Sequence, residues 1–115
     1  MKAELAPLED IVAAASRIGR FVAGLNHAAF MENEEKQSAI FGQVIIIGEA
    51  ATRLPESFLD AHSEVPWRQM MGMRNRIVHG NDEIDWDIVW PVAVDEIPAL
   101  IHLLSPLLAQ GHRDR

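Results

Sequence analysis

Apolar residues recur with the 3.6-residue period of an α-helix along nearly the whole of this 115-residue chain. The first stretch begins at Pro7, which suits the first turn of a helix because its missing N–H would have no helical partner there. Gly24 and Asn26-His27 end the stretch. Its apolar stripe consists of Ile11, Ala15, Ile18, Val22 and Leu25. We therefore expect a first helix from Pro7 to about residue 25.

A second helix is predicted between Asn33 and Pro55. Asn33 is a good N-cap, and Glu34 and Glu35 follow it in the first turn, where the helix dipole favours acids. Pro55 ends the helix because a proline disfavours helical geometry in the residue before it. The apolar stripe consists of Ile40, Val44, Ile47, Ala51 and Leu54. A strand over residues 44–47 is the alternative, which the flanking Gln, Glu and Ala and the lack of a second strand disfavour.

The second half of the chain is also expected to be helical. Residues 55–64 form a short helical turn. A third main helix opens at Val65-Pro66-Trp67 and closes at Gly80, which we expect in the left-handed conformation. The last helix starts near Asp85, a candidate N-cap, and runs to about Leu108. Kinks or short breaks are expected at its three prolines: Pro91, Pro98 and Pro106.

These elements predict an all-α protein, an up-and-down bundle of four to five helices. We expect residues 1–110 to form a single domain and residues 111–115 to form a frayed tail. The chain has no cysteine, and no histidine pair has metal-ligand spacing beside a carboxylate, so we expect no metal and no cofactor. Since no run reaches the roughly 18 apolar residues of a membrane span and the N-terminus has no signal-peptide core, a soluble cytoplasmic protein without a membrane partner is expected.

The charge of the chain reverses locally. Ten basic and seventeen acidic residues give a net charge of −7, whereas a protein that coats nucleic acid in general is normally basic. Residues 65–80 contain no acid, yet they include Arg68, Arg74 and Arg76. If the protein binds an anionic ligand, this window is where we expect it to bind.

The segment from Arg74 to His79 contains the candidate chemistry. On a helix, Asn75 and His79 share a face, and Arg76 also neighbours His79. A histidine in the last turn lies at the negative end of the helix dipole, which favours its protonated form. An arginine and a titratable histidine can together hold a phosphate and move a proton on it, which suffices for metal-free cleavage of RNA by its own 2′-OH. The residues alone favour a structural interpretation, in which His79 caps the helix and the arginines pair with nearby acids.

An ordered set of motifs resembles the HepT-like family of HEPN domains. The motifs are Ile47-Gly48-Glu49-Ala50-Ala51 with Leu54-Pro55, Pro66-Trp67-Arg68, the run from Gly72 to Gly80, Ile84-Asp85, Ile88-Val89-Trp90, and Asp95-Glu96-Ile97-Pro98 with Leu100. The resemblance extends from about Leu8 to Leu108. An Arg-x4-His spacing alone is common in helices, whereas the ordered set is specific.

The resemblance implies a ribonuclease toxin of a toxin–antitoxin pair, whose helical bundle forms a homodimer with two Arg-x4-His motifs in one cleft. At the matching positions, Arg74 would bind the scissile phosphate, His79 would act as general base or acid, and Asn75 would help to orient the site. The RNA substrate would be cut to a 2′,3′-cyclic phosphate and a 5′-hydroxyl without a metal. On charge alone, we add Arg68 and Arg76 as contacts to the RNA backbone.

The chain departs from the family pattern at Asn81. Many members carry there a tyrosine that a partner nucleotidyltransferase antitoxin adenylylates, whereas this chain has no tyrosine. Either the antitoxin neutralises the protein by binding, or it modifies another side chain, or the pair has diverged. The alternative function is a non-catalytic HEPN module that binds a nucleotidyltransferase partner or a nucleotide.

Two other groups of residues have competing interpretations. Trp86 and Trp90 are four residues apart on the last helix, and packing in a core or dimer is favoured over stacking on bases. Glu49 is expected to be a partly buried carboxylate that pairs with Arg53 or with an arginine of the third helix.

Overall fold

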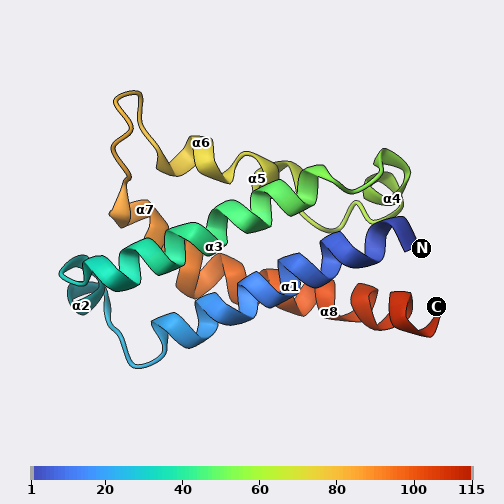
Figure 1. The fold of residues 1–115 in the computed structure, drawn as a ribbon, viewed down its shortest axis with the longest axis horizontal. Coiled ribbons are helices and arrows are strands. Elements are labelled where there is room, and N and C mark those ends of the chain that lie inside the picture. The colour runs from blue at the N-terminus through green and yellow to red at the C-terminus, as the bar shows by residue number, and fades with distance from the viewer. Residues whose placement is uncertain (1, 115) are drawn as a thin grey trace.

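The computed structural model describes residues 2–114 of the chain, which are helical almost throughout (Figure 1). The elements are α1 (Lys2–Val22), α2 (His27–Met31), α3 (Glu34–Thr52), α4 (Glu56–Ala61), α5 (Trp67–Met71), α6 (Met73–Ile77), α7 (Trp86–Pro91), the π-helical turn η1 (Val92–Glu96) and α8 (Ile97–Arg113). Among the described residues, the one extended pairing is a single antiparallel bridge between Val78 and Ile84. The predicted all-α class is confirmed.

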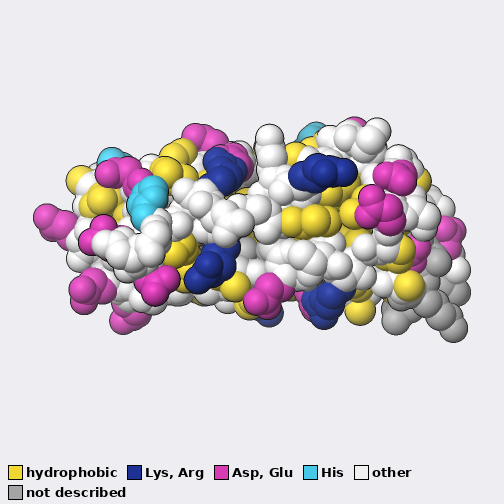
Figure 2. All heavy atoms as spheres, turned by 90° about the horizontal axis from the view of Figure 1, so that it is seen from above, with side chains coloured by type: hydrophobic (Ala, Val, Ile, Leu, Met, Phe, Trp, Pro, Cys, Tyr) yellow, Lys and Arg dark blue, Asp and Glu magenta, His cyan; other side chains and the backbone are white. Residues whose placement is uncertain are grey.

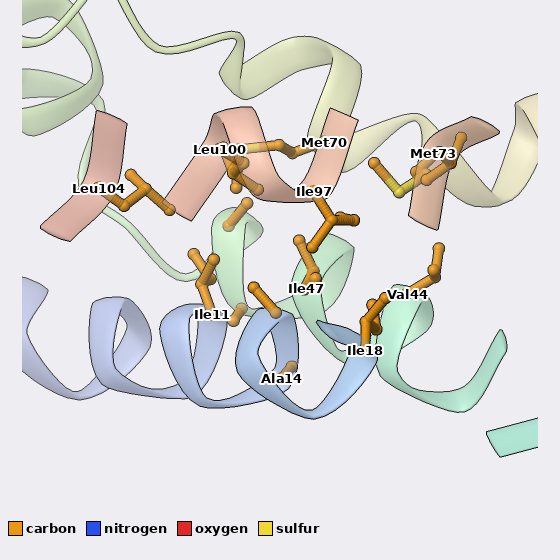
Figure 3. Packing of buried hydrophobic residues seen from close by; sticks show 14 of the residues in the cluster. Ile11, Ala14, Ile18, Val44, Ile47, Met70, Met73, Ile97, Leu100 and Leu104 are labelled. Atoms are coloured by element: carbon orange, nitrogen blue, oxygen red, sulfur yellow. The ribbon is translucent and has the colours of Figure 1, made fainter. Parts of the chain in front are cut away.

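The core of the bundle lies between α1, α3 and α8. α1 packs along both of the other helices, and α5 and α6 pack against α3. Ile18 of α1, Val44 of α3 and Ile97 of α8 point into this core, and each is at most 1% exposed (Figure 3). Burying a side chain of this size stabilises the fold by about 1.5–3 kcal/mol. The apolar stripes predicted from the sequence are therefore the surfaces that join the helices.

The first helix starts earlier than expected. α1 begins at Lys2, so the prediction of a start at Pro7 is wrong. Leu5 and Leu8 are three residues apart, and they are only 5% and 0% exposed, so the buried stripe continues upstream of the proline. This burial outweighs the single helical hydrogen bond that Pro7 cannot donate.

The second main helix, α3, has the expected boundaries. Oδ1 of Asn33 accepts the backbone N–H of Lys36 at 3.0 Å, which confirms the N-cap. The short helix α4 follows within residues 55–64, as predicted.

A Cβ atom on Gly48 would lie 3.0 Å from the carbonyl oxygen of Met70, so the close approach of α3 to α5 requires the absence of a side chain at this position.

The third main helix is broken where a continuous helix was predicted. Gly72 separates α5 from α6, and α6 ends at Ile77, because Val78 is extended (φ −109°, ψ 120°) and bridges to Ile84. Both side chains pack against the core, which favours this pairing over another turn of helix. Gly80 is not the left-handed residue either. That conformation belongs to Asp82 (φ 62°), later in the loop.

The last helix is continuous from Trp86 to Arg113. Asp85 caps it as predicted, since its Oδ1 accepts the backbone N–H groups of Asp87 and Ile88 at 3.1 and 3.3 Å. The helix is distorted in the π turn η1, which directly follows Pro91. α8 then passes through Pro106 and includes residues 111–113, which were expected to be a frayed tail.

Within residues 2–114, Trp86–Arg113 is also the one segment that is long and apolar enough, by length and composition, to cross a membrane. The core helix of a soluble bundle passes the same test, and one side of this segment belongs to the core. Its buried hydrophobic residues are Val89, Val92, Ala93, Ile97, Leu100 and Leu104.

Candidate active site

The helix α6 presents its polar residues to solvent because two apolar residues anchor it. Met73 and Ile77 are four residues apart and are 3% and 0% exposed. Arg74, Asn75 and Arg76 lie between them on the outward side, and all three are exposed. The two anchors therefore determine which side chains of the Arg-x4-His motif can meet a ligand.

His79 lies in a tight loop and not on the helix. Its backbone N–H donates to the carbonyl of Glu83 at 2.8 Å, and its carbonyl accepts the N–H of Asp82 at 2.9 Å. The N–H of Asp85 closes the loop on the carbonyl of Ile77 at 2.7 Å. Figure 1 shows this loop projecting between α6 and α7. The prediction that His79 shares a helical face with Asn75 and lies in the last turn of the helix is therefore wrong.

The loop brings His79 against Asp85. Nε2 of His79 lies 3.1 Å from Oδ2 of Asp85, while Oδ1 of the same carboxylate accepts the two backbone N–H groups that begin α7. The hydrogen bond with His79, helped by those N–H groups, lowers the pKa of Asp85 from its ordinary value. The carboxylate is therefore ionised at neutral pH. The imidazole remains 54% exposed, so its other edge is open to a ligand.

Asp85 was recognised from the sequence as an N-cap and as part of the Ile84-Asp85 motif, but its contact with His79 was missed. The signal was the combination of that motif with a loop too short to separate the two side chains. The contact between His79 and Asp85 does not follow from a sequence interpretation that assigns residues 78–80 to a helix, because a helix would place His79 far from Asp85.

Arg74 lines a small hollow of about 140 Å³ against α3, together with Glu49 and Met71. Within the described part of the chain, its guanidinium forms no ion pair. Glu49 does not form the expected pair with Arg53 either. Glu49 is exposed, and Arg53 instead binds Asp10 of α1 at 2.7 Å. Arg74 therefore offers a positively charged group that can bind an anion.

Arg76 is engaged inside the protein. Its two terminal nitrogens donate to the two carboxylate oxygens of Glu96 in η1, each at 2.9 Å. This pairing raises the pKa of Arg76 and lowers that of Glu96. A forked contact of this kind satisfies the same donors that would bind a phosphate. Arg76 thus joins α6 to η1 in this structure.

Arg68 lies apart from Arg74. It lines a different hollow, of about 600 Å³, formed by α4 and α5 with the acidic residues Glu56 and Asp60. Arg74 does not line that hollow. Figure 2, a view onto α5, α6 and the loop, shows the basic side chains of this face as separate groups and not as a continuous patch. Residues 65–80 therefore do not form one site that contains all three of their arginines, Arg68, Arg74 and Arg76.

The tryptophans of the last helix are partly buried and pack against the core. The rings of Trp86 and Trp90 lie 6.1 and 5.1 Å from the ring of Phe30, measured between centroids. This arrangement agrees with the packing interpretation of the two residues. Among residues 2–114, no group of three or more histidines and acids is placed to hold a metal ion.

Comparison with known proteins gives the family of the chain. Residues 11–107, which include α6, the loop and Asp85, match the family model described as "Ribonuclease HepT-like". The "Probable ribonuclease HepT" of Thermococcus cleftensis is 33% identical over 93 residues, which cover 81% of this chain and 84% of that protein. The "Putative RNase TTE0752" of Caldanaerobacter subterraneus subsp. tengcongensis is 32% identical over 108 residues, which cover 94% and 96%.

Comparison with solved structures gives no significant match. The sequence comparisons are sufficient, because the matched region contains nearly the whole bundle and every motif on which the resemblance was based. The chain belongs to the ribonuclease HepT-like family.

Proposed function

We propose that this protein is a metal-independent endoribonuclease that acts in the cytoplasm as the toxin of a toxin–antitoxin pair. Membership of the HepT-like family and the names of its relatives support a ribonuclease. One observation carries the proposal. The exposed imidazole of His79 is held by the ionised carboxylate of Asp85, and Arg74, five residues before His79, forms no ion pair among the described residues. An anchored imidazole and an available guanidinium are the two groups that cleavage of a phosphodiester by its own 2′-OH requires.

In the proposed reaction, Arg74 binds the scissile phosphate and stabilises the charge that develops on its oxygens. Asn75, exposed next to it, helps to orient the phosphate. The 2′-hydroxyl gives its proton to His79, and the 2′-oxygen attacks phosphorus. The bond from phosphorus to the 5′-oxygen breaks, and that oxygen takes a proton from the protonated His79 of a second copy. The RNA loses one proton and gains one, and its products are a 2′,3′-cyclic phosphate and a 5′-hydroxyl.

Two copies of the chain are proposed to form one cleft. In a single copy, Arg74 is an isolated positive charge near a loop that carries Asp82 and Glu83, and the whole chain has a net charge of −7. RNA binding depends on neutralising phosphates. A second copy supplies a second arginine and the second histidine that the reaction uses, so a homodimer is the functional unit of this proposal. Contacts of Arg68 and Arg76 with the RNA backbone stay predictions, and that of Arg76 requires release from Glu96.

The proposed antitoxin is a nucleotidyltransferase-type partner that neutralises the ribonuclease by binding over the loop. Asn81 lies in that loop, two residues beyond His79, and the chain contains no tyrosine. A partner seated there would cover the exposed edge of the imidazole without any covalent change.

The alternative function is a non-catalytic module that binds the nucleotidyltransferase or a nucleotide. The acidic surroundings of the loop, with Asp82, Glu83 and Asp87 all exposed, favour it, because they oppose the approach of RNA.

A cleavage assay distinguishes the two functions. Purified protein is incubated with total tRNA and an mRNA in EDTA, and it is compared with His79→Ala and with His102→Ala, which removes an exposed histidine of α8. The ribonuclease proposal expects cyclic-phosphate ends from the unchanged protein and from His102→Ala, and none from His79→Ala. If the folded, unchanged protein cuts neither RNA, the binding module is the better assignment.

A further inference from the structure

The carboxylate of Asp85 has both of its oxygens occupied in the loop that presents His79. Oδ1 accepts two backbone N–H groups at the start of α7, and Oδ2 lies 3.1 Å from Nε2 of His79. The side chain of Asp85 is only 29% exposed. Its orientation is thus determined by the helix that it caps, and the second oxygen is directed at the imidazole.

We propose that Asp85 is a positioning residue that holds His79 in the tautomer protonated at Nε2, so that Nδ1 is the nitrogen that exchanges a proton with the RNA. This inference deepens the proposed ribonuclease function and rests on it. An ionised carboxylate can only accept hydrogen bonds, so the nitrogen that faces it must carry the proton. A neutral imidazole has one N–H, and Nδ1 is then left with a free lone pair.

The backbone of the loop keeps the two residues in this relationship. The N–H of His79 is bonded to the carbonyl of Glu83, and the N–H of Asp85 is bonded to the carbonyl of Ile77. The bridge between Val78 and Ile84 lies between these two bonds and packs against the core. The backbone bonds of the loop itself therefore place Asp85 beside His79.

The assignment specifies one proton transfer. Nδ1 of His79 takes the proton of the 2′-hydroxyl while the 2′-oxygen forms its bond to phosphorus, which gives an imidazolium whose Nε2–H still donates to Asp85. The carboxylate stabilises that positive charge, and the bond from phosphorus to the 5′-oxygen breaks as described above. The imidazolium formed in this way returns its proton to solvent or to the leaving oxygen of the next substrate.

Asp85 also caps α7, so the test must separate the two roles. Asp85→Asn keeps a capping oxygen, as Asn33 shows in this same chain at the start of α3. Its amide nitrogen can only donate, so it turns towards Nε2 and favours the opposite tautomer, with the proton on Nδ1. Asp85→Ser also keeps a cap, but its shorter side chain loses the contact with His79. The matched control is Glu9→Gln, which removes a carboxylate 3.7 Å from His112 on another part of the surface.

The first measurement is the tautomer of His79. Protein labelled with ¹⁵N-histidine is studied by long-range ¹H–¹⁵N spectra well above the pH at which free histidine titrates, and the signals of His79 are assigned by their loss in His79→Ala. The expected result is a protonated Nε2 in the unchanged protein and in Glu9→Gln, a protonated Nδ1 in Asp85→Asn and a mixture in Asp85→Ser. A protonated Nδ1 in the unchanged protein would overturn the assignment.

The second measurement is the kinetics of RNA cleavage. In Asp85→Asn, kcat is expected to fall about 100-fold or more with KM unchanged, because Nδ1 of His79 then carries the proton and the base is lost while phosphate binding is kept. In Asp85→Ser, where part of the His79 population keeps a free Nδ1, kcat is expected to fall less. Glu9→Gln should keep the original kcat. Normal kcat in both Asp85 variants contradicts a positioning role. If the unchanged, folded protein cuts no RNA, the proposed function fails and the catalytic role of Asp85 with it, whereas the spectra still show whether Asp85 selects the tautomer.

Discussion

Arg76 of α6 and Glu96 of η1 are joined by two parallel hydrogen bonds of 2.9 Å, although twenty residues separate them in the sequence. The pair connects the helix that carries Arg74 to the last helical segment of the chain. Each side chain is 39% exposed, so the bonds are partly screened by solvent. The guanidinium that was expected to meet RNA is thus used to hold the candidate active site on the bundle.

Replacing Glu96 by Gln should lower the free energy of unfolding by about 0.5–1 kcal/mol at neutral pH. The pKa of Glu96 is lowered in the folded protein, so its contribution is present above the ordinary carboxyl value and is lost as the pH falls through the folded pKa. The difference in the free energy of unfolding between the unchanged protein and Glu96→Gln, measured in urea, should therefore become smaller below about pH 4.5. An equal difference at all pH values would show that the ionised pair is not its cause.

Arg76→Ala should lose a similar amount of stability and keep most of its cleavage activity, because the guanidinium is occupied by Glu96. Cleavage and urea unfolding are measured on the same preparations. A large loss of cleavage in Arg76→Ala but not in Glu96→Gln would instead support a contact between Arg76 and the RNA backbone.

Arg74→Ala should abolish cleavage and leave the stability within about 0.5 kcal/mol, since Arg74 is exposed and forms no ion pair among the described residues. Arg20→Ala is the control, because it removes the same charge from the exposed surface of α1. Cleavage is followed in EDTA and folding by circular dichroism. An active, folded Arg74→Ala protein would refute the role of Arg74 in the site.

Mixing unchanged chains with His79→Ala chains tests whether the site is shared between copies. A mixed dimer contains only one of the two histidines that the proposed reaction uses, so co-refolding with an excess of His79→Ala chains should lower the activity per unchanged chain. Sedimentation at micromolar concentration should show a dimer for each preparation. Monomers of full activity, or an activity per unchanged chain that does not fall on mixing, would argue against a composite cleft.

Gly48→Ala should lower the free energy of unfolding by about 1–3 kcal/mol, because the new Cβ would lie 3.0 Å from the carbonyl oxygen of Met70, and α5 would have to move. Gly42→Ala is the matched control on the same helix. A Cβ there meets nothing within 4 Å, so the substitution should stabilise the protein by about 0.4–1 kcal/mol. Thermal or urea unfolding measures both changes, and equal effects at the two positions would contradict the packing of α3 against α5.

The features that could be predicted from the sequence depend on residues close together in the chain. The apolar stripes follow from the period of the helix, and the caps at Asn33 and Asp85 follow from side chains that bond backbone groups two or three residues away. The ordered motifs likewise indicated the family and the candidate residues Arg74 and His79. All of these signals are local in the sequence, and the features that they predict are kept when the helices pack together.

The relationships that give the site its chemistry depend on packing between distant segments. α6 ends at Ile77 because Val78 and Ile84 gain more by pairing over the core than by continuing the helix, and this places His79 beside Asp85. The position of α6 on the bundle likewise brings Arg76 within ion-pair distance of Glu96, and it leaves Arg74 without an ion pair among the described residues. From the sequence alone, several acidic residues are possible ion-pair partners for each basic side chain. The positions of the packed helices determine which acidic residue comes within hydrogen-bond distance.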